Sequence, residues 1–291
     1  MSLYHPNDSK DNCGFGLIAH TTGEASHKIV STAIHALDRM QHRGGIAADG
    51  KTGDGCGLLM QKPNSFFQAI ASENGWKLSK KYAVGMVFLS QNKALAEAAR
   101  SVLNEELERE TLNVVGWRIV PTDHSVLGDL AATGVPQIEQ VFVNAPSGWR
   151  KRDVERRLYM ARRRTEKRLS TDPDFYVACL SGLVSIYKGL VMPIDLPKFY
   201  LDLADERMQS AICVFHQRFS TNTLPRWPLA QPFRFLAHNG EINTIRGNRD
   251  WSRARSNKFV TPLLPDLQDA APFVNLEGSD SSSLDNMLEL F

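Results

Sequence analysis

Cysteine is scarce in this sequence: its 291 residues include four, at Cys13, Cys56, Cys179 and Cys213. All four lie far apart and no two form a Cys-x-x-Cys pair, which argues against a disulfide framework and against a metal site. Cys179 and Cys213 fall in apolar runs typical of strands, so we expect them in the core. Such thiols are typical of a reducing compartment, and we expect the protein in the cytoplasm.

Long hydrophobic runs and an excess of charge of one sign are also missing. No apolar stretch approaches the roughly 20 residues that a membrane-spanning helix needs. Residues Met1 to Asn12 are polar and have no apolar centre, so they are not a secretory signal. The net charge of +2 gives no reason to expect a nucleic acid or an anionic membrane as a partner. With 42% hydrophobic residues, the chain has the composition of a soluble globular protein.

Hydrophobic periodicity predicts strands and helices in mixed order, an arrangement compatible with antiparallel connections. The predicted strands are 14–20, 82–89, 114–120, 137–144 and 211–219, with a strand hairpin over 175–190, and the predicted helices are 29–40, 93–110 and 199–208. Between the first helix and residue 57 the sequence is rich in glycine. That composition lets the backbone turn sharply and approach another surface closely.

The segment Arg150–Arg168 is densely basic and has apolar residues at helical spacing. Two interpretations are open, a solvated helix face or a helix that binds nucleic acid. Glu155 and Glu166 lie within the run and the total charge is balanced. Both facts favour the solvated face.

The last residues, Ser283–Phe291, place Leu284, Met287 and Leu288 on one face of a predicted helix. The pattern continues to Phe291 without a glycine or a basic residue to end the helix. We therefore expect the chain to be a fragment of a longer protein, truncated at its C-terminal end.

The stretch Asp11-Asn12-Cys13-Gly14-Phe15-Gly16 contains a cysteine that becomes N-terminal if Met1 to Asn12 is removed. An N-terminal cysteine combines a nucleophile and a base, because its thiol attacks while its free α-amine, with a pKa of roughly 7.7–8.0, accepts and returns the proton. The alternative is that Cys13 is a small buried hydrophobic residue, as most lone cysteines are.

The segment His216-Gln217-Arg218-Phe219-Ser220-Thr221 has an arginine at the end of a predicted strand, followed by two hydroxyl residues. A guanidinium can hold a carboxylate through two parallel hydrogen bonds. On its own this pattern is weak, since a structural salt bridge at Arg218 is the commoner outcome.

The segment Leu236-Ala237-His238-Asn239-Gly240-Glu241 is predicted as an apolar strand that ends in Asn-Gly. The simple interpretation is a turn. The functional one is an oxyanion hole, made by the side-chain amide of Asn239 and the backbone N–H of Gly240. We assign His238 a structural role, because an N-terminal cysteine needs no histidine as its base.

The segment Gly278-Ser279-Asp280-Ser281-Ser282-Ser283 is suited to begin a helix, since serine and aspartate are favoured N-cap residues. Asp280 is also suited to bind the ammonium group of a substrate. The two roles are compatible.

Taken together, these motifs resemble a known family. Cys-Gly-Phe-Gly, Gln-His-Arg-Gly at 41–44, His-x-Arg-Phe-Ser-Thr, His-Asn-Gly and Ser-Asp-Ser stand in the order found in the class II glutamine amidotransferases. That family belongs to the N-terminal nucleophile hydrolases. The chain is most similar to its glutamate synthase branch, and the resemblance covers nearly the whole chain.

The resemblance implies an α+β fold, a four-layer αββα sandwich with two stacked, mainly antiparallel sheets between helices. It implies a leader at 1–12 that is removed and an amidotransferase domain at 13–291. The roles that it implies are Cys13 as nucleophile, Asn239 and Gly240 as oxyanion hole, Arg218 as binder of the α-carboxylate with Thr221 nearby, Asp280 as binder of the α-ammonium, and Arg43 as support for the site.

The implied reaction is hydrolysis of L-glutamine to glutamate and ammonia, with no metal or other cofactor in this chain. In the longer parent, the ammonia would be used with 2-oxoglutarate to make glutamate. FMN and an iron–sulfur cluster are then expected in domains that this chain lacks, with C-terminal synthase domains and a small electron-donating subunit as partners. Three alternatives stay open: another ammonia acceptor, a non-catalytic docking domain, and a nucleic-acid-binding protein that uses Arg150–Arg168.

Overall fold

The computed structural model describes residues 14–218 and 223–291, which form two antiparallel sheets of four strands each. The first sheet has the order β1-β8-β2-β7 and the second β4-β5-β3-β6. The strands of the first sheet are β1 (Phe15–Ala19), β2 (Cys56–Gln61), β7 (Val184–Gly189) and β8 (Ile212–Gln217), and those of the second are β3 (Tyr82–Leu89), β4 (Asn113–Ile119), β5 (Gln137–Asn144) and β6 (Tyr176–Ser181).

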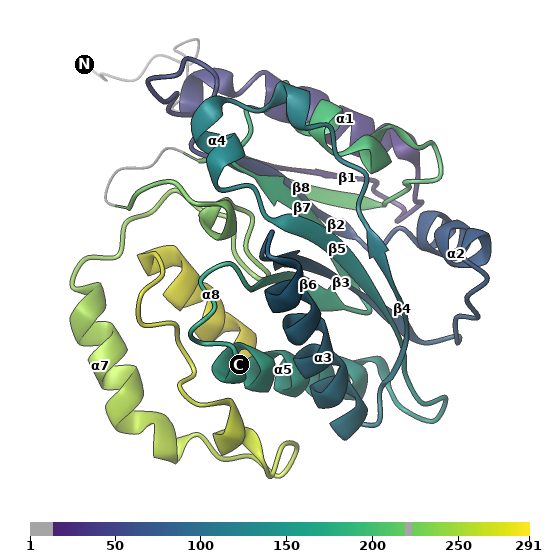
Figure 1. The fold of residues 1–291 in the computed structure, drawn as a ribbon, viewed down its shortest axis with the longest axis vertical. Helices are drawn as coiled ribbons and strands as arrows, with labels where there is room; N and C mark the ends of the chain where they lie inside the picture. Colours follow the sequence, from purple (N-terminus) through teal and green to yellow (C-terminus); the bar gives the residue numbers. More distant parts are fainter. Residues whose placement is uncertain (1–13, 219–222) are drawn as a thin grey trace, which may run out of the picture.

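Helices cover the outer faces of the two stacked sheets. α1 lies on the first sheet, and α3 and α5 lie on the second, so that the layers follow the order α-β-β-α (Figure 1). The four-layer fold expected from the sequence is confirmed. The helices are α1 (His27–Asp38), α2 (Asn64–Glu73), α3 (Lys93–Arg109), α4 (Asp129–Thr133), α5 (Lys151–Arg168), α6 (Leu196–Phe199), α7 (Ile245–Arg255) and α8 (Asp280–Leu290). Within the described residues, none is long and apolar enough to cross a membrane.

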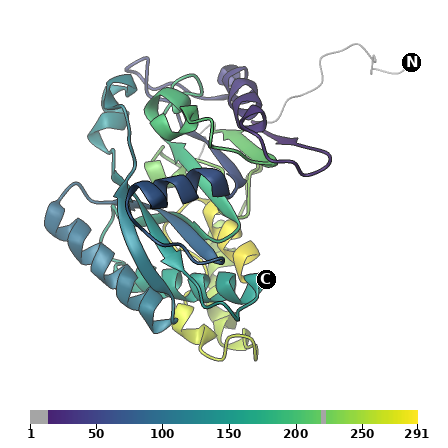
Figure 2. The same ribbon diagram turned by 90° about the vertical axis from the view of Figure 1, so that its right-hand side faces the viewer.

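Two apolar clusters hold the layers together. The larger fills the space between the sheets and reaches α1, and the second lies between the second sheet and α3 with α5. All eight residues of β3 are buried, because this inner strand contributes side chains to both clusters. Figure 2 shows the same layers from the side, with α3 along the outer edge of the molecule.

Strands predicted at 14–20, 82–89, 114–120, 137–144 and 211–219 correspond to β1, β3, β4, β5 and β8, although residue 219 lies outside the described part of the chain. The helix predicted at 199–208 is wrong. The chain forms α6, then a 3-10 turn at Leu201–Ala204, with Tyr200 extended between them. The Tyr200 ring is fully buried and packs edge-on against Tyr187, which favours the extended backbone over a continuous helix.

The hairpin predicted over 175–190 is also wrong, because β6 and β7 follow one another in sequence but belong to different sheets. β6 pairs with β3, whereas β7 pairs with β2. Glu155 of α5 fixes the connection between β6 and β7, because its carboxylate accepts hydrogen bonds from Ser181 Oγ and Gly182 N, both at 2.7 Å. Periodicity locates strands in a sequence, but it carries no information on which partner each strand finds.

The basic helix α5 departs from the solvated face that the sequence favoured. Arg162 and Arg164 expose only 1% and 4% of their surface. Arg164 donates to Glu106 at 2.7 Å and to Asp266 at 3.2 Å, and it also contacts Glu110. These central arginines are bound to carboxylates inside the protein, so they do not provide a surface for phosphate groups.

The pKa of nearby Glu166 shows how strongly these arginines stabilise a carboxylate. Burial alone raises the pKa of its carboxyl, but the guanidinium groups of Arg162 and Arg163 outweigh that effect and hold the pKa at about 2. Arg163 donates to the Glu166 carboxylate at 2.6 Å, as does Arg162. Glu166 is therefore ionised at neutral pH.

Replacing Arg164 by alanine is expected to lower the free energy of unfolding by about 3 kcal/mol, because the buried Glu106 and Glu110 would lose a shared cation. Urea unfolding followed by circular dichroism measures the change. Arg150→Ala is the matched control at the exposed start of the same helix and should leave the urea midpoint unchanged. Equal midpoints for Arg164→Ala and the wild type would show that the buried pairs do not stabilise the fold.

Candidate active site

The polar end of the first sheet brings three distant segments together. β8 lies between β1 and β2, and its last residues continue the pairing beyond the strands. Gln217 N donates to the carbonyl of Gly14 at 2.6 Å, and Arg218 N donates to the carbonyl of Gly55 at 2.9 Å. The sheet register therefore places Arg218 beside the residue that follows Cys13 in the chain.

Two glycines in the predicted motifs are required by close approach. A Cβ on Gly14 would stand 2.5 Å from the carbonyl oxygen of Gln217 and 2.7 Å from the Asn239 amide. A Cβ on Gly44 would collide with the Gln217 side chain. At Gly14 the contact is with a backbone carbonyl, so a larger residue would push the two segments apart, whereas at Gly44 the Gln217 side chain would have to move. Gly14 and Gly44 thus let the chain around both residues pack closely against Gln217.

A polar cavity of about 840 Å³ opens at this end of the sheet. Arg43, Arg218, Asn239, Gly240 and Asp280 all line it, so the structure brings together five of the seven residues predicted to form the site. The other two, Cys13 and Thr221, lie outside the described residues.

Arg218 is a buried cation in the wall of the cavity. Its Nη1 donates to the carbonyl of Asp54 at 3.4 Å and its Nη2 to the carbonyl of Thr223 at 3.2 Å. Burial lowers the pKa of the guanidinium, and the nearby carboxylates of Asp54 and Asp280 oppose that shift. An arginine stays charged even so, and a cation poorly screened by water binds a carboxylate strongly.

Asp280 stands at the start of α8, which begins three residues earlier than the helix predicted from Ser283. Ser279 is the N-cap, and its Oγ accepts from Ser282 N at 3.1 Å, as the serine run predicted. The Asp280 carboxylate accepts from Ile242 N at 2.7 Å and from Ser281 N at 2.6 Å. It reaches the cavity as an anion and also fixes the chain around Ile242.

The predicted strand at 236–241 is wrong, because these residues form neither a strand nor a helix. Gln231 fixes the backbone instead. Its amide donates to the carbonyl of His238 and accepts from His238 N, both at 3.1 Å. A side chain thus supplies the two hydrogen bonds that a neighbouring strand would have made.

The Asn239 side chain contacts the residue that follows Cys13. The hydrogen-bond network assigns its amide oxygen as the acceptor for Gly14 N–H, and its nitrogen then lies 2.7 Å from His216 Nε2 and 3.3 Å from the carbonyl of His238. Burial is the main cause that lowers the pKa of His216 to about 4, so its ring is neutral at pH 7. Asn239 therefore joins the start of β1 to the end of β8.

His238 organises the backbone beside the cavity. Its Nδ1 accepts from Gly240 N at 3.1 Å, and its Nε2 lies 2.8 Å from Ser281 Oγ. Burial lowers the pKa of the His238 ring, although Asp280 acts in the opposite direction. The N–H of Gly240 and the amide of Asn239 are therefore both bound to protein groups, and an incoming oxyanion would have to compete with these contacts.

The three described cysteines are poor nucleophiles. Cys56, Cys179 and Cys213 are buried, and burial raises the pKa of each thiol, in the case of Cys213 to about 12. Cys56 Sγ also lies 3.3 Å from the carbonyl oxygen of Val191. A thiol held in its protonated form reacts slowly. In the described part of the chain, no group of three or more His, Cys, Asp or Glu is arranged to hold a metal.

Sequence reasoning missed Arg249 of α7, which also lines the cavity. Its guanidinium donates to the carbonyls of Leu276, Gly278 and Ser279 and to Ser283 Oγ, and so clamps the loop that leads to Asp280. Gln231 was missed as well. Both residues act on backbone groups or hydroxyls, and contacts of that kind leave no motif in the sequence.

Comparison with known protein families identifies the family of the chain. Residues 13–291 match the model of the glutamine amidotransferases of class II. The match covers nearly the whole chain, and the protein belongs to that family.

Curated relatives of the chain include glutamate synthases. The chain is 43% identical over 294 residues to the glutamate synthase [NADPH] large chain of Bacillus subtilis, a match that covers 100% of this chain and 19% of the relative. It is 42% identical over 287 residues to ferredoxin-dependent glutamate synthase 2 of Synechocystis, covering 97% of this chain and 18% of the relative. The chain thus spans about a fifth of the length of these proteins.

Proposed function

We propose that this chain hydrolyses L-glutamine to L-glutamate and ammonia, with Cys13 as an N-terminal nucleophile. The observation that supports this most directly is the cavity itself. A buried cation, Arg218, and an anion, Asp280, face the same space as Asn239, whose side chain contacts the backbone of the residue after Cys13. Arg218, Asp280 and Asn239 suit the carboxylate, the ammonium and the amide of glutamine respectively.

In the proposed mechanism, the Cys13 thiol gives its proton to the free α-amine of the same residue as the sulfur attacks the side-chain amide carbon of glutamine. Asn239 and the N–H of Gly240 stabilise the oxyanion that forms. The protonated α-amine then delivers the proton to the departing ammonia, which leaves a glutamyl thioester. Water attacks the thioester, releases glutamate and restores the thiol.

The remaining site residues hold the substrate. Arg218 binds the α-carboxylate of glutamine, with Thr221 nearby, and Asp280 binds the α-ammonium. Arg43 supports the site from the cavity wall. Because Gly240 N–H donates to His238 Nδ1 in this structure, the mechanism requires that hydrogen bond to give way when the oxyanion forms.

The larger activity proposed for the parent follows from its relatives, which are named glutamate synthases. Ammonia from this domain would react with 2-oxoglutarate in C-terminal synthase domains, with FMN, an iron–sulfur cluster and a small electron-donating subunit. Among the described residues, Cys56, Cys179 and Cys213 are buried, separate thiols and do not form the set of thiolate ligands that an iron–sulfur cluster needs, so we propose the cluster for the synthase domains. Such free thiols suit the cytoplasm, where we place the protein.

The first test is processing of the N-terminus together with activity. We expect cleavage between Asn12 and Cys13, so N-terminal sequencing of active chains should read Cys-Gly-Phe-Gly, and the same preparation should release glutamate and ammonia from glutamine. Intact mass gives the processed fraction. Full activity in chains that still begin at Met1 would exclude the α-amine mechanism. A correctly processed chain without glutaminase activity would favour a docking domain instead.

A further inference from the structure

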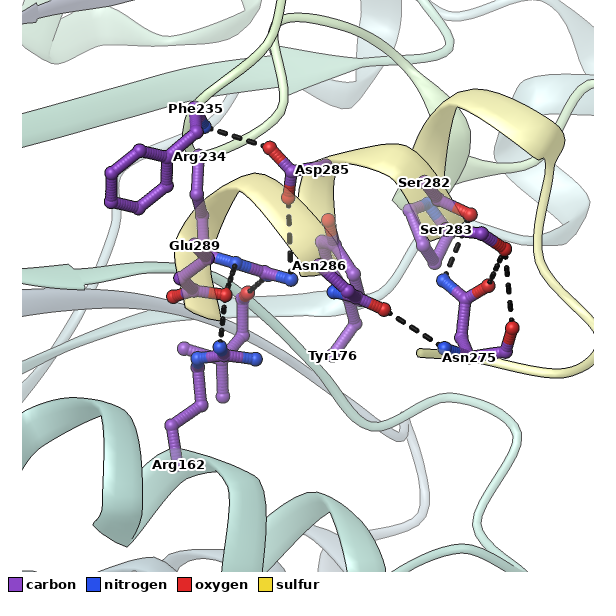
Figure 3. Close-up of polar contacts among 12 residues, drawn as sticks. Arg162, Tyr176, Arg234, Phe235, Asn275, Ser282, Ser283, Asp285, Asn286 and Glu289 are labelled. Carbon is purple, nitrogen blue, oxygen red and sulfur yellow. Dashed lines mark hydrogen bonds and ion pairs between the residues drawn. The ribbon is translucent and has the colours of Figure 1, made fainter. Parts of the chain in front are cut away.

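Helix α8 contacts the chain segment 234–242 at successive points along one of its faces. Near its C-terminal end, Glu289 accepts from Arg234 Nε at 3.2 Å. One turn earlier, Asp285 Oδ1 accepts from the backbone N–H of Phe235 at 2.7 Å (Figure 3). The helix and the segment run in opposite directions at these contacts.

The contacts continue to the N-terminal end of α8. Ser281 Oγ lies 2.8 Å from His238 Nε2, and Asp280 accepts from Ile242 N at 2.7 Å. Residues 281, 285 and 289 are four apart, and residues at that spacing share a face of a helix. Asn239 and Gly240 therefore stand between two fixed points.

The segment takes its geometry from side-chain contacts, those with α8 and those of Gln231 with His238. Residues 234–242 form no strand or helix, so no backbone ladder fixes them. α8 in turn is fixed to the rest of the fold, since Glu289 also contacts Arg162 of α5 (Figure 3). In addition, Arg234 Nη1 donates to the carbonyl of Val177 in β6 at 2.8 Å. Asp285 lies at the middle of this arrangement with none of its surface exposed.

α8 also holds a second segment, through Asn286 and Ser283. Asn286 Oδ1 accepts from Asn275 N at 2.9 Å, and Ser283 Oγ lies 2.9 Å from Asn275 Oδ1 (Figure 3). These bonds fix the loop before Ser279 and do not involve 234–242. One helix thus holds two segments through different side chains.

We propose that Asp285 is a positioning residue that sets where Asn239 and Gly240 stand relative to Asp280. The inference rests on the proposed function, in which Asp280 binds the ammonium end of glutamine and Asn239 with Gly240 serve the amide end. Both ends of the substrate are then held from one rigid helix, Asp280 directly and the oxyanion donors through Phe235. α8 therefore sets the distance between Asp280 and the oxyanion donors, and this distance has to match the length of glutamine.

The test compares Asp285→Ala with Asn286→Ala in the processed chain. Each variant removes one acceptor of a backbone N–H from a buried position, and Asp285→Ala also removes the carboxylate that lies 3.6 Å from Arg234 Nη2. Asp285→Ala should lower kcat for glutamine by about 10-fold to 100-fold, because displacement of a catalytic group by about 1 Å costs up to about 100-fold. Its KM should stay within about threefold of the wild type. Asn286→Ala should leave kcat within about twofold.

Two further measurements separate positioning from loss of folding. Asp285→Asn keeps an oxygen acceptor for Phe235 N–H and should recover at least half of the lost activity on a logarithmic scale. Hydrogen exchange should show faster exchange of the 235–242 amides in Asp285→Ala, with β3 and β5 still protected. This readout needs no turnover, so it tests the contact even if the chain proves not to be a glutaminase. Unchanged exchange in 235–242, or equal kcat in the Asp285→Ala and Asn286→Ala variants, would overturn the proposal.

Discussion

Replacing Cys13 by alanine is expected to abolish the release of glutamate and ammonia from glutamine. The alanine chain would have no group to form the thioester, and the three described cysteines cannot substitute, because burial raises the pKa of their thiols. A coupled assay for glutamate should give a rate at the level of the blank. Cys13→Ser should retain little activity, since a hydroxyl is a far weaker nucleophile than a thiol near neutral pH.

Covalent labelling identifies the thiol independently of the rate. The glutamine analogue diazo-oxo-norleucine should modify Cys13 in the folded protein, and peptide mass spectrometry should find Cys56, Cys179 and Cys213 unmodified. Loss of labelling in Cys13→Ala provides the control. Modification centred on Cys56 would show that the nucleophile had been assigned to the wrong cysteine.

Asn239→Ala is expected to lower kcat by about 10²–10³, the cost found for single oxyanion donors in other enzymes. The oxyanion exists only after attack, so the loss should fall on kcat more than on KM. Asn239→Asp should be at least as harmful, because it places a negative charge against a developing one. Asn239→Ala also removes the acceptor of Gly14 N–H at the start of β1, whereas Asn239→Asp keeps an oxygen there.

Arg218 and Asp280 provide the contrast for that experiment. They are assigned to the charges of the glutamine backbone, which are the same in the ground state and the transition state. Arg218→Lys and Asp280→Asn should therefore mainly raise KM. An Asn239→Ala enzyme with unchanged kcat and a raised KM would make Asn239 a binding contact and remove it from the oxyanion hole.

Much of the fold was accessible from local patterns. β3 and β5 occupy the predicted ranges, Tyr82–Leu89 and Gln137–Asn144, because both are apolar runs buried inside the layers. β2 was missed, since Cys56–Gln61 directly follows a glycine-rich loop that hides the start of a strand. The partner of each strand was beyond prediction, because pairing depends on distant parts of the chain.

In the candidate site, too, some residues could be predicted from local motifs and others could not. The motif residues Arg218, Asn239 and Asp280 were identified from the sequence, and the cavity unites them. The residues that support them were not, since Gln231 and Arg249 act on backbone groups and hydroxyls that any sequence possesses. The solvated face predicted for α5 was wrong for a related reason. Its arginines are adjacent in the sequence, but their acidic partners, such as Glu106 and Asp266, lie in distant segments.

The pairing of β1 with β8 also determines when the site can assemble. β1 is made early and β8 late, yet Phe15 stands opposite His216 and Gly14 is bonded to Gln217. A ribosome adds about 5–20 residues per second, so the roughly 200 residues between the two strands take about 10–40 s to synthesise. Until then the first strand has no neighbour in its sheet, and contacts this distant in sequence form slowly. Cleavage before Cys13, if it depends on the folded site, therefore has to wait until β8 has been synthesised.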